Sequence, residues 1–216
     1  MSDIATAPNN ATSDQADDPS LLKAHGTILN FQILNGKMAM WMFLASEVMF
    51  FTGLIGSYIV LRAGQDTWGD PTSEAYPLAI GLTAANTFLL ICSSVTFVWG
   101  LQHYQMNNKT KGTIGMALTT FFGAVFVGVQ VFEYYELISH RQMLPSGDIM
   151  SGCFYAMTSF HGLHVLLGVV ALAVLTILGA KGKFGADNYA WVEFTGLYWH
   201  FIDLVWVFVF TFFYLI

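Results

Sequence analysis

Residues 191–210 read WVEFTGLYWHFIDLVWVFVF. This stretch is apolar enough to enter a lipid bilayer, yet it contains Glu193, His200 and Asp203. An ionisable side chain near the bilayer centre costs at least about 2.5 kcal/mol on insertion scales. The stretch therefore predicts a membrane helix in which other groups offset that cost.

Four more stretches of this kind precede it in a chain of 216 residues that is 55% hydrophobic and 10% charged. About 20 apolar residues in a row are needed to cross a hydrocarbon core about 30 Å thick. Runs this long predict helices, because barrel strands are about ten residues long and alternate in polarity. We expect an all-α integral membrane bundle of five transmembrane helices, at residues 38–61, 78–101, 113–138, 152–179 and 191–216, joined by polar breaks at 62–77, 102–112, 139–151 and 180–190.

The positive charges are divided unevenly between the two sides of this arrangement. Of the 8 Lys and Arg residues, only Arg62 and Arg141 fall on the second side. The positive-inside rule then puts the N-terminus in the cytoplasm and the C-terminus outside, in agreement with five crossings. The residues on the first side are Lys23, Lys37, Lys109, Lys111, Lys181 and Lys183.

The N-terminal segment differs in composition from the rest of the chain. Residues 1–20 are small, polar and acidic, so they cannot bury enough apolar surface to fold, and we expect disorder there. They also lack the basic and apolar regions of a cleaved signal peptide. We divide the chain into a cytoplasmic tail at 1–37, disordered at its start, and a membrane domain at 38–216. The net charge of −6 gives no reason to expect nucleic-acid binding.

Glu47 lies nine residues into the first predicted helix, about 14 Å along its axis and near the bilayer midplane. We expect its side chain to be neutral or hydrogen-bonded at pH 7, because loss of water disfavours the charged form. Two roles stay open for it, interhelical hydrogen bonding and a proton-related function.

His161 and His164 lie one turn apart in the fourth predicted helix and share a face with Gly168. The spacing lets both imidazoles point to one neighbour, where they could ligate a metal or haem or bond to acids on adjacent helices. Two histidines are a weak metal signal by themselves, since metal sites need more ligands.

The last predicted helix carries a stripe with alternating spacings of three and four residues, which is one face of a helix. We expect this stripe to face protein and to lie at the depth of Glu47 and the two histidines of the fourth helix. A buried network among the first, fourth and fifth helices is the resulting prediction, with the stretch at 78–101 as a packing helix. The stripe consists of Glu193, Gly196, His200, Asp203 and Val207, and the opposite face, suited to lipid, of Phe194, Leu197, Phe201, Leu204 and Phe208.

Glu133 and Glu136 fall near the outer end of the third predicted helix. At that depth a water-facing carboxylate costs little, so the pair could be an interfacial anchor with Tyr134 and Tyr135, or part of a site.

Several functional classes fit these residues. A metal enzyme would use Glu133, Glu136, His161, His164, His200 and Asp203 as ligands, but the Glu-x-x-His pairs of di-iron bundles are absent. A haem between His200 and either His161 or His164 is a further possibility. A transporter is disfavoured, because no helix has an interior proline and no repeat is evident. The third class is an accessory subunit of a larger complex, and composition does not choose among the three.

Three motifs carry a family resemblance over roughly residues 38–216. They are MWMFLASEVMFFTGLIGSYIVLR at 40–62, FHGLHVLLG at 160–168 and WVEFTGLYWHFIDLVWVFVFTFFYL at 191–215, with EYYE at 133–136 in support. In this order they resemble subunit III of the haem-copper respiratory oxidases, the cytochrome c oxidase subunit III family. The resemblance implies a multi-pass protein of the bacterial cytoplasmic (inner) membrane and of the aerobic respiratory chain.

The resemblance further implies a non-redox accessory subunit of a proton-pumping terminal oxidase that reduces O2 to water. In that family haem and copper lie in subunits I and II, while subunit III stabilises subunit I, binds phospholipids and supports proton uptake. A larger respiratory supercomplex is a further implied partner. No catalytic residue, metal or cofactor is implied for this chain itself.

The resemblance also assigns expected roles to single residues of this chain. Glu47 matches the buried carboxylate of the family. At the outer end of the first helix, Arg62 could contact a lipid phosphate or serve as an interfacial anchor. The polar signature positions are matched by His161, His164, Glu193, His200 and Asp203.

The chain departs from the family in length, since many members have seven helices. Their first two helices form one wall of a lipid-filled cleft, which is therefore in doubt here. The five-helix form also occurs in quinol oxidases, and related subunits accompany nitric oxide reductases. Both stay as alternatives, with a membrane metal or haem enzyme as the most distant one.

Overall fold

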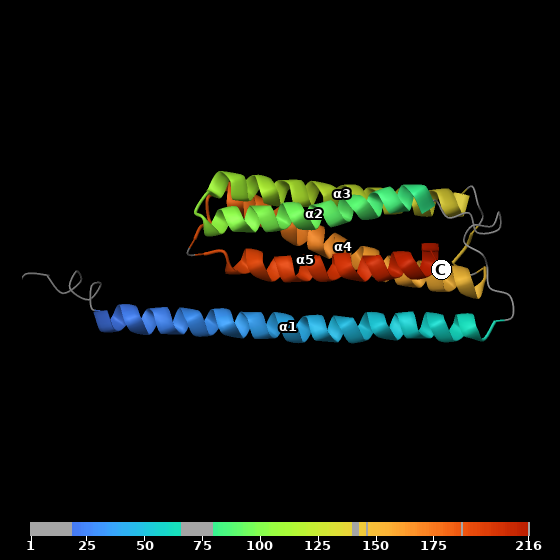
Figure 1. Ribbon diagram of the computed structural model, residues 1–216, viewed down its shortest axis with the longest axis horizontal. Helices are drawn as coiled ribbons and strands as arrows, with labels where there is room; N and C mark the ends of the chain where they lie inside the picture. The colour runs from blue at the N-terminus through green and yellow to red at the C-terminus, as the bar shows by residue number, and fades with distance from the viewer. Residues whose placement is uncertain (1–18, 66–79, 140–142, 146, 187, 216) are drawn as a thin grey trace, which may run out of the picture. The chain divides into compact units, whose positions relative to one another are not determined.

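Five α-helices and one short π-helix make up the described part of the computed structural model, which covers residues 19–65, 80–139, 143–145, 147–186 and 188–215 (Figure 1). Each α-helix contains a stretch long and apolar enough to cross a membrane. The prediction of an all-α, five-helix membrane protein is confirmed for these residues. The elements are α1 (Pro19–Ala63), α2 (Ile80–Gln105), α3 (Lys109–Ser139), α4 (Ile149–Ala180), α5 (Ala190–Phe210) and the π-helix η1 (Thr211–Leu215).

The helix bounds differ from the predicted ones mainly at the two ends of the chain. Helix α1 begins at Pro19 rather than near residue 38, and the last turns of the predicted fifth helix are π-helical. The chain forms two compact units, Met1–Trp41 and Met42–Ile216. The predicted tail up to residue 18, most of the break at 62–77, and Arg141 lie outside the described residues.

Within the second unit, four helices form a closed ring. Helix α2 packs on α3, α3 on α4, α4 on α5, and α5 returns to α2. Figure 1 shows these helices running side by side, joined in sequence by short connections. The part of α1 in this unit contacts α4 and α5 through aromatic side chains: the ring centroids of Phe50 and Phe160 are 5.2 Å apart, and those of Phe51 and Phe201 are 6.4 Å apart.

Two glycines allow α2 and α3 to approach each other closely. A Cβ atom placed on Gly115 would lie 2.5 Å from the Cα of Gly100, and one on Gly100 would lie 3.1 Å from the Cα of Gly115. Small residues at helix crossings are the usual means of association in membranes, where packing replaces the hydrophobic effect. Neither position leaves room for a side chain.

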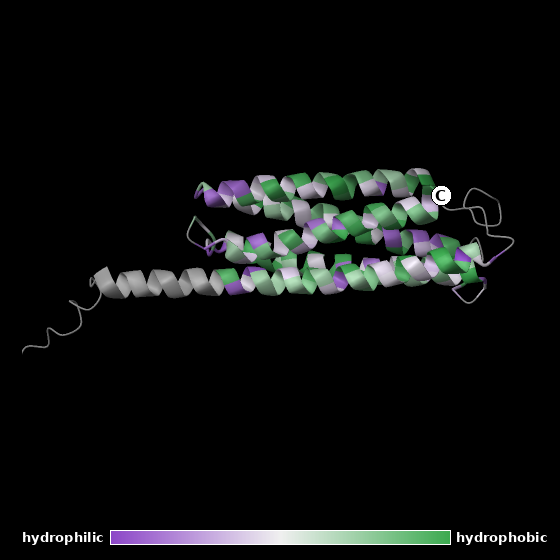
Figure 2. Cartoon of the chain, turned by 60° about the horizontal axis from the view of Figure 1, so that its bottom comes forward, coloured by the Kyte–Doolittle hydropathy of each residue, from purple (hydrophilic) through white to green (hydrophobic). Residues whose placement is uncertain are grey.

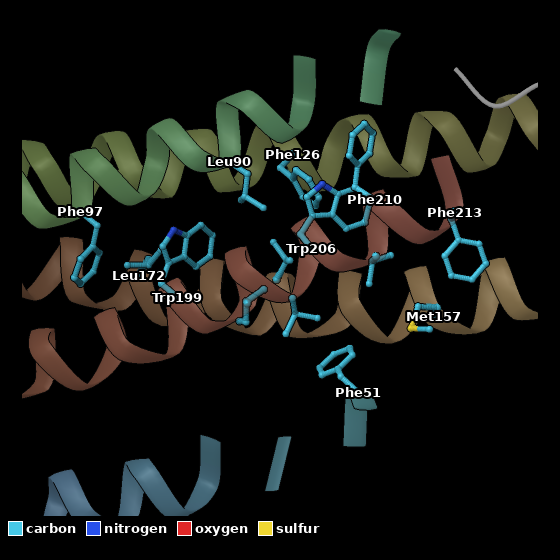
Figure 3. Close-up of a cluster of buried hydrophobic side chains, with 14 of the residues drawn as sticks. Phe51, Leu90, Phe97, Phe126, Met157, Leu172, Trp199, Trp206, Phe210 and Phe213 are labelled. Carbon is cyan, nitrogen blue, oxygen red and sulfur yellow. The ribbon is translucent and has the colours of Figure 1, made fainter. Parts of the chain in front are cut away.

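The core of the ring is built around two tryptophans of α5. Trp199 and Trp206 are each 1% exposed and point toward α2 and α3 (Figure 3). Phe97 and Leu90 of α2 and Phe126 of α3 close around them.

The predicted inward stripe of α5 is therefore only partly right. Gly196 and Asp203 are buried, but Val207 is 39% exposed, and Glu193 and His200 are half-buried at the edge. The buried face centres on the tryptophans, because the largest apolar side chains fill the space between the helices best. On the predicted lipid face, Leu204 and Phe208 are exposed.

The outside of the second unit is apolar along most of its length. Figure 2 shows hydrophobic residues covering the middle of the helices, with many of the hydrophilic ones near the helix ends. Phe121 and Val131 of α3 are 62% and 63% exposed. Such a surface suits a hydrocarbon environment and neighbouring membrane proteins rather than water.

Candidate functional site: buried polar pairs between the helices

Glu47 of α1 and His164 of α4 form a direct pair. Oε2 of Glu47 lies 3.1 Å from Nε2 of His164, and the two side chains are 17% and 15% exposed. The sequence predicted that Glu47 would lie at the same depth as the two histidines of the fourth helix. The structure brings Glu47 together with one of them, His164.

The second nitrogen of the imidazole fixes the number of protons in this pair. Nδ1 of His164 lies 2.7 Å from the carbonyl oxygen of Phe160. Because a carbonyl can only accept, Nδ1 carries a hydrogen. A single proton then joins Nε2 to Glu47 Oε2, either as a neutral acid with a neutral imidazole or as a carboxylate with an imidazolium. Both forms have no net charge, which lowers the cost of placing the pair in a membrane.

Aromatic rings surround the pair on the α1 side. The ring centroids of Phe51 and His164 are 5.2 Å apart, and those of Phe50 and His164 are 6.2 Å apart. Tyr198 of α5 donates its hydroxyl hydrogen to the carbonyl oxygen of His164 at 3.2 Å. The pair thus sits where α1, α4 and α5 meet.

His161 does not join this pair, although it lies one turn away. Its ring is fully buried and stacked on Trp206, with a centroid distance of 4.8 Å, and its edge meets Phe126. Neither ring nitrogen has a hydrogen-bond partner among the described residues. The two histidines do not share one neighbour, although their spacing would allow it, because His161 turns into the ring of helices and His164 turns toward α1.

Asp203 pairs with α2 rather than with α1 or α4. Ser94 donates its hydroxyl hydrogen to Oδ2 of Asp203 at 2.6 Å. On either side, Trp199 donates to the hydroxyl of Ser93 at 3.0 Å and Trp206 donates to Thr87 at 2.9 Å. Helix α2 is therefore the polar partner of α5.

Sequence reasoning missed this role of α2. Its other buried polar residues lie three, four and ten positions after Thr83, which is one helical face. That spacing of hydroxyl and amide side chains in an apolar run was the available signal. The residues are Thr83, Asn86, Thr87 and Ser93, with Ser94 beside them.

Glu133 is buried in a second carboxylate site and is 5% exposed. Its Oε1 accepts hydrogen bonds from Tyr214 at 2.9 Å and from Thr83 at 3.0 Å. The interpretation of Glu133 as a water-facing anchor is wrong, because these two donors satisfy the carboxyl group inside the bundle. Glu136 is half-buried and Tyr135 is exposed.

The remaining predicted residues lie outside these pairs. His200 meets the ring of Phe97 edge-on at 5.6 Å. Glu193 is half-buried near the start of α5. Arg62 donates from Nη1 to the hydroxyl of Tyr58 at 3.0 Å, and Tyr58 donates to the carbonyl oxygen of Phe212 at 2.9 Å.

The single network predicted among three helices is thus divided into separate pairs. Among the described residues, no group of three or more His, Cys, Asp or Glu side chains could hold a metal ion. The three imidazoles face Trp206, Glu47 and Phe97, so they do not face one another as a bis-histidine haem site requires. The described polar side chains bond mainly between helices.

Comparison with known proteins supplies the family. The profile of the family described as cytochrome c oxidase subunit III matches residues 17–216. The cytochrome c oxidase subunit 3 of Alkalihalophilus pseudofirmus is 34% identical over 90% of this chain and 93% of its own length. That of Bacillus subtilis is 32% identical over 84% and 88%. A probable quinol oxidase subunit 3 of Staphylococcus saprophyticus is 33% identical over 83% and 88%.

Proposed function

Because the chain belongs to the cytochrome c oxidase subunit III family, we propose that it is the non-redox accessory subunit of a proton-pumping haem-copper terminal oxidase. The match over residues 17–216 carries this proposal. The oxidase as a whole reduces O2 to water in the bacterial membrane. This chain supplies a helical partner for it rather than the redox centre.

The polar pairs support an accessory role. Three carboxyl groups bond between elements: the half-buried Glu47 joins α1 to α4, the buried Asp203 joins α5 to α2, and the buried Glu133 joins α3 to both α2 and η1. Such bonds hold a membrane bundle together, because an unbonded polar group in hydrocarbon is costly.

Haem and copper belong, in this proposal, to partner subunits I and II. The exposed apolar faces of the helices provide surface for subunit I and for phospholipids. At the end of α1, Arg62 is a candidate contact for a lipid phosphate, held in place by Tyr58. The Glu47 and His164 pair is the candidate for a proton-related role, since it shares a single proton.

Purification through a tag on this chain tests the proposal. We expect the tagged chain to bring down larger subunits with the optical spectrum of haem and a copper content above background. The purified material should consume O2 when supplied with an electron donor. A colourless chain without partner subunits would contradict the proposal.

The electron donor separates this function from the second candidate, a quinol oxidase subunit, which the Staphylococcus saprophyticus relative favours. Reduced cytochrome c and a reduced quinol are offered to the same preparation in turn. Oxidation of cytochrome c supports the first candidate, and oxidation of the quinol alone supports the second. Reduction of nitric oxide in place of O2 would assign the complex to the nitric oxide reductases.

A further inference from the structure

A groove of about 280 Å³ lies where α3 begins and α4 ends. Lys109, Thr110 and Ile114 line it from α3, and Gly179, Ala180 and Gly182 line it from the end of α4 and the residues that follow. It belongs to none of the polar pairs described above. Its floor is fixed, because Thr113 below it bonds to the hydroxyl of the buried Tyr104 at 2.9 Å.

Lys109 is held at the mouth of the groove. Its Nζ donates to the carbonyl oxygen of Gly182 at 3.3 Å, which positions the ammonium group between the two connections. An ammonium has three donors, so two remain for another acceptor. Among the described residues, no carboxylate lies within ion-pair distance of Lys109.

Further positive charge surrounds this end of the bundle. Lys181 and Lys183 are exposed and flank Gly182 in the sequence. Together with Lys109 and Lys111 they give four positive charges at the start of α3 and on the connection that follows α4. That connection also contains one acid, Asp187, which lies outside the described residues.

The groove changes from polar to apolar along α3. Ile114, five residues beyond Lys109, is 48% exposed, and the side chains of Leu118 and Phe121 further along α3 are 41% and 62% exposed. A free anion would contact only the lysines. A molecule with a negatively charged headgroup and an apolar tail would contact both the lysines and the apolar face of α3.

We propose that this groove binds the phosphate headgroup of an anionic phospholipid, with Lys109 as the main contact and the acyl chain along the Ile114 face. Basic pockets between transmembrane helices at a membrane surface recognise such headgroups by charge. The phosphate oxygens accept hydrogen bonds from the two remaining N–H groups of Lys109. The positive charges of Lys181 and Lys183 add long-range electrostatic attraction. The site is separate from Arg62 and does not depend on the proposed oxidase function.

Native mass spectrometry of the purified full-length chain in detergent tests the proposal. Phosphatidylglycerol is titrated against the wild type and against Lys109→Gln, and the dissociation constant of the tightest lipid is measured. We expect the variant to bind about tenfold more weakly, as for loss of a hydrogen bond to a charged group. Equal binding by both chains would overturn the proposal.

Lys111→Gln is the matched control, because it removes the same charge two residues away, and Lys111 does not line the groove. A loss equal to that of Lys109→Gln would show a general charge effect and overturn the site. Ala180→Trp fills the groove without changing charge and should also weaken binding, whereas Val174→Trp, on another face of α4, should not. Circular dichroism checks that each variant keeps its helix content.

Two ligand controls separate lipid from other sources of the same chemistry. Phosphatidylcholine, which has no net charge, should bind at least tenfold more weakly than phosphatidylglycerol. Inorganic phosphate at the lipid concentration should not displace phosphatidylglycerol, because it lacks the acyl chains. Displacement by phosphate, or equal affinity for the two lipids, would overturn the proposal.

Discussion

At the scale of single residues, the ionisable groups inside the bundle differ in how they are bonded. Glu47 and His164 share one proton and carry no net charge as a pair. Glu133 accepts two hydroxyl hydrogens, and His161 stacks on Trp206 without a polar partner among the described residues. Substitutions can test each of these arrangements by itself.

Removing the Glu47 carboxyl should cost little stability but change the infrared spectrum. In Glu47→Gln the amide can still donate to Nε2 of His164, so the unfolding midpoint should change only slightly. The infrared band of the Glu47 side chain, which is that of a carboxylic acid or of a carboxylate according to which partner holds the shared proton, should disappear in this variant.

A double-mutant cycle with Glu47→Ala and His164→Ala should give a coupling of about 0.6 to 1.7 kcal/mol, the range seen for interhelical bonds in membranes. The free energy of unfolding in mixed detergent gives this number. An infrared spectrum of the wild type with an ionised Glu47 would place the shared proton on His164, and one with a neutral Glu47 would place it on the carboxyl group.

His161→Phe should leave the bundle at least as stable as the wild type. Phenylalanine keeps the stack on Trp206 and removes two nitrogens that lack partners, and an unsatisfied buried polar group costs about 1 to 3 kcal/mol. Thermal unfolding of the purified chain measures the change. A marked loss of stability would instead show that the imidazole nitrogens have partners of their own.

At the scale of elements, polar bonds connect α2 to α5, and both polar bonds and close packing connect α2 to α3. Ser94, Ser93 and Thr87 of α2 bond to Asp203, Trp199 and Trp206 of α5. The Gly100 and Gly115 crossing brings the backbones of α2 and α3 together. Thr96 and Thr119 bond across the same two helices at 2.9 Å, and Thr83 bonds to Glu133 at 3.0 Å.

Asp203→Ala should weaken the α2 and α5 contact by about 1 to 3 kcal/mol, because Ser94 loses its acceptor inside the bundle. Asp203→Asn keeps an oxygen acceptor and is expected to lose less. The yield of assembled complex and its thermal unfolding midpoint report the effect. Normal assembly combined with loss of a haem or metal signal would favour a site role for Asp203.

Gly115→Leu should disrupt the crossing of α2 and α3. Its side chain would enter space held by the backbone of Gly100, and overpacking of this kind costs at least about 1 to 3 kcal/mol. Gly128→Leu is the control on the same helix, because a Cβ there meets nothing within 4 Å. The yield of folded protein should fall in the first variant only.

At the scale of the whole molecule, two lysine-bearing segments lie at the same end of the bundle. Lys109, the first residue of α3, donates to the carbonyl oxygen of Gly182 in the connection between α4 and α5. This contact places two of the three predicted positive segments side by side, as the positive-inside rule requires if that end is cytoplasmic.

Reporter fusions at the C-terminus test the orientation. With the lysines in the cytoplasm and five crossings, the C-terminus lies outside the cytoplasm. Alkaline phosphatase fused after Ile216 should then be active, and green fluorescent protein fused at the same position should not fluoresce. The opposite pair of results would reverse the topology. Exchanging Lys109 and Lys181 for Gln should weaken the preference.

The sequence by itself determined that the chain crosses the membrane five times as helices, because backbone groups in hydrocarbon must bond within the segment whatever the neighbours are. It also determined the family, through three motifs that keep their order. The depth of Glu47 was predictable for the same reason, since a helix rises by a fixed amount per residue.

Only the tertiary structure decided which polar group meets which. His161 and His164 are one turn apart, yet one stacks on Trp206 and the other bonds to Glu47. Asp203 found its partner in α2, a helix that the sequence marked only as packing. Spacing along a helix fixes depth and face, but the neighbour on that face depends on how helices far apart in sequence are arranged around one another.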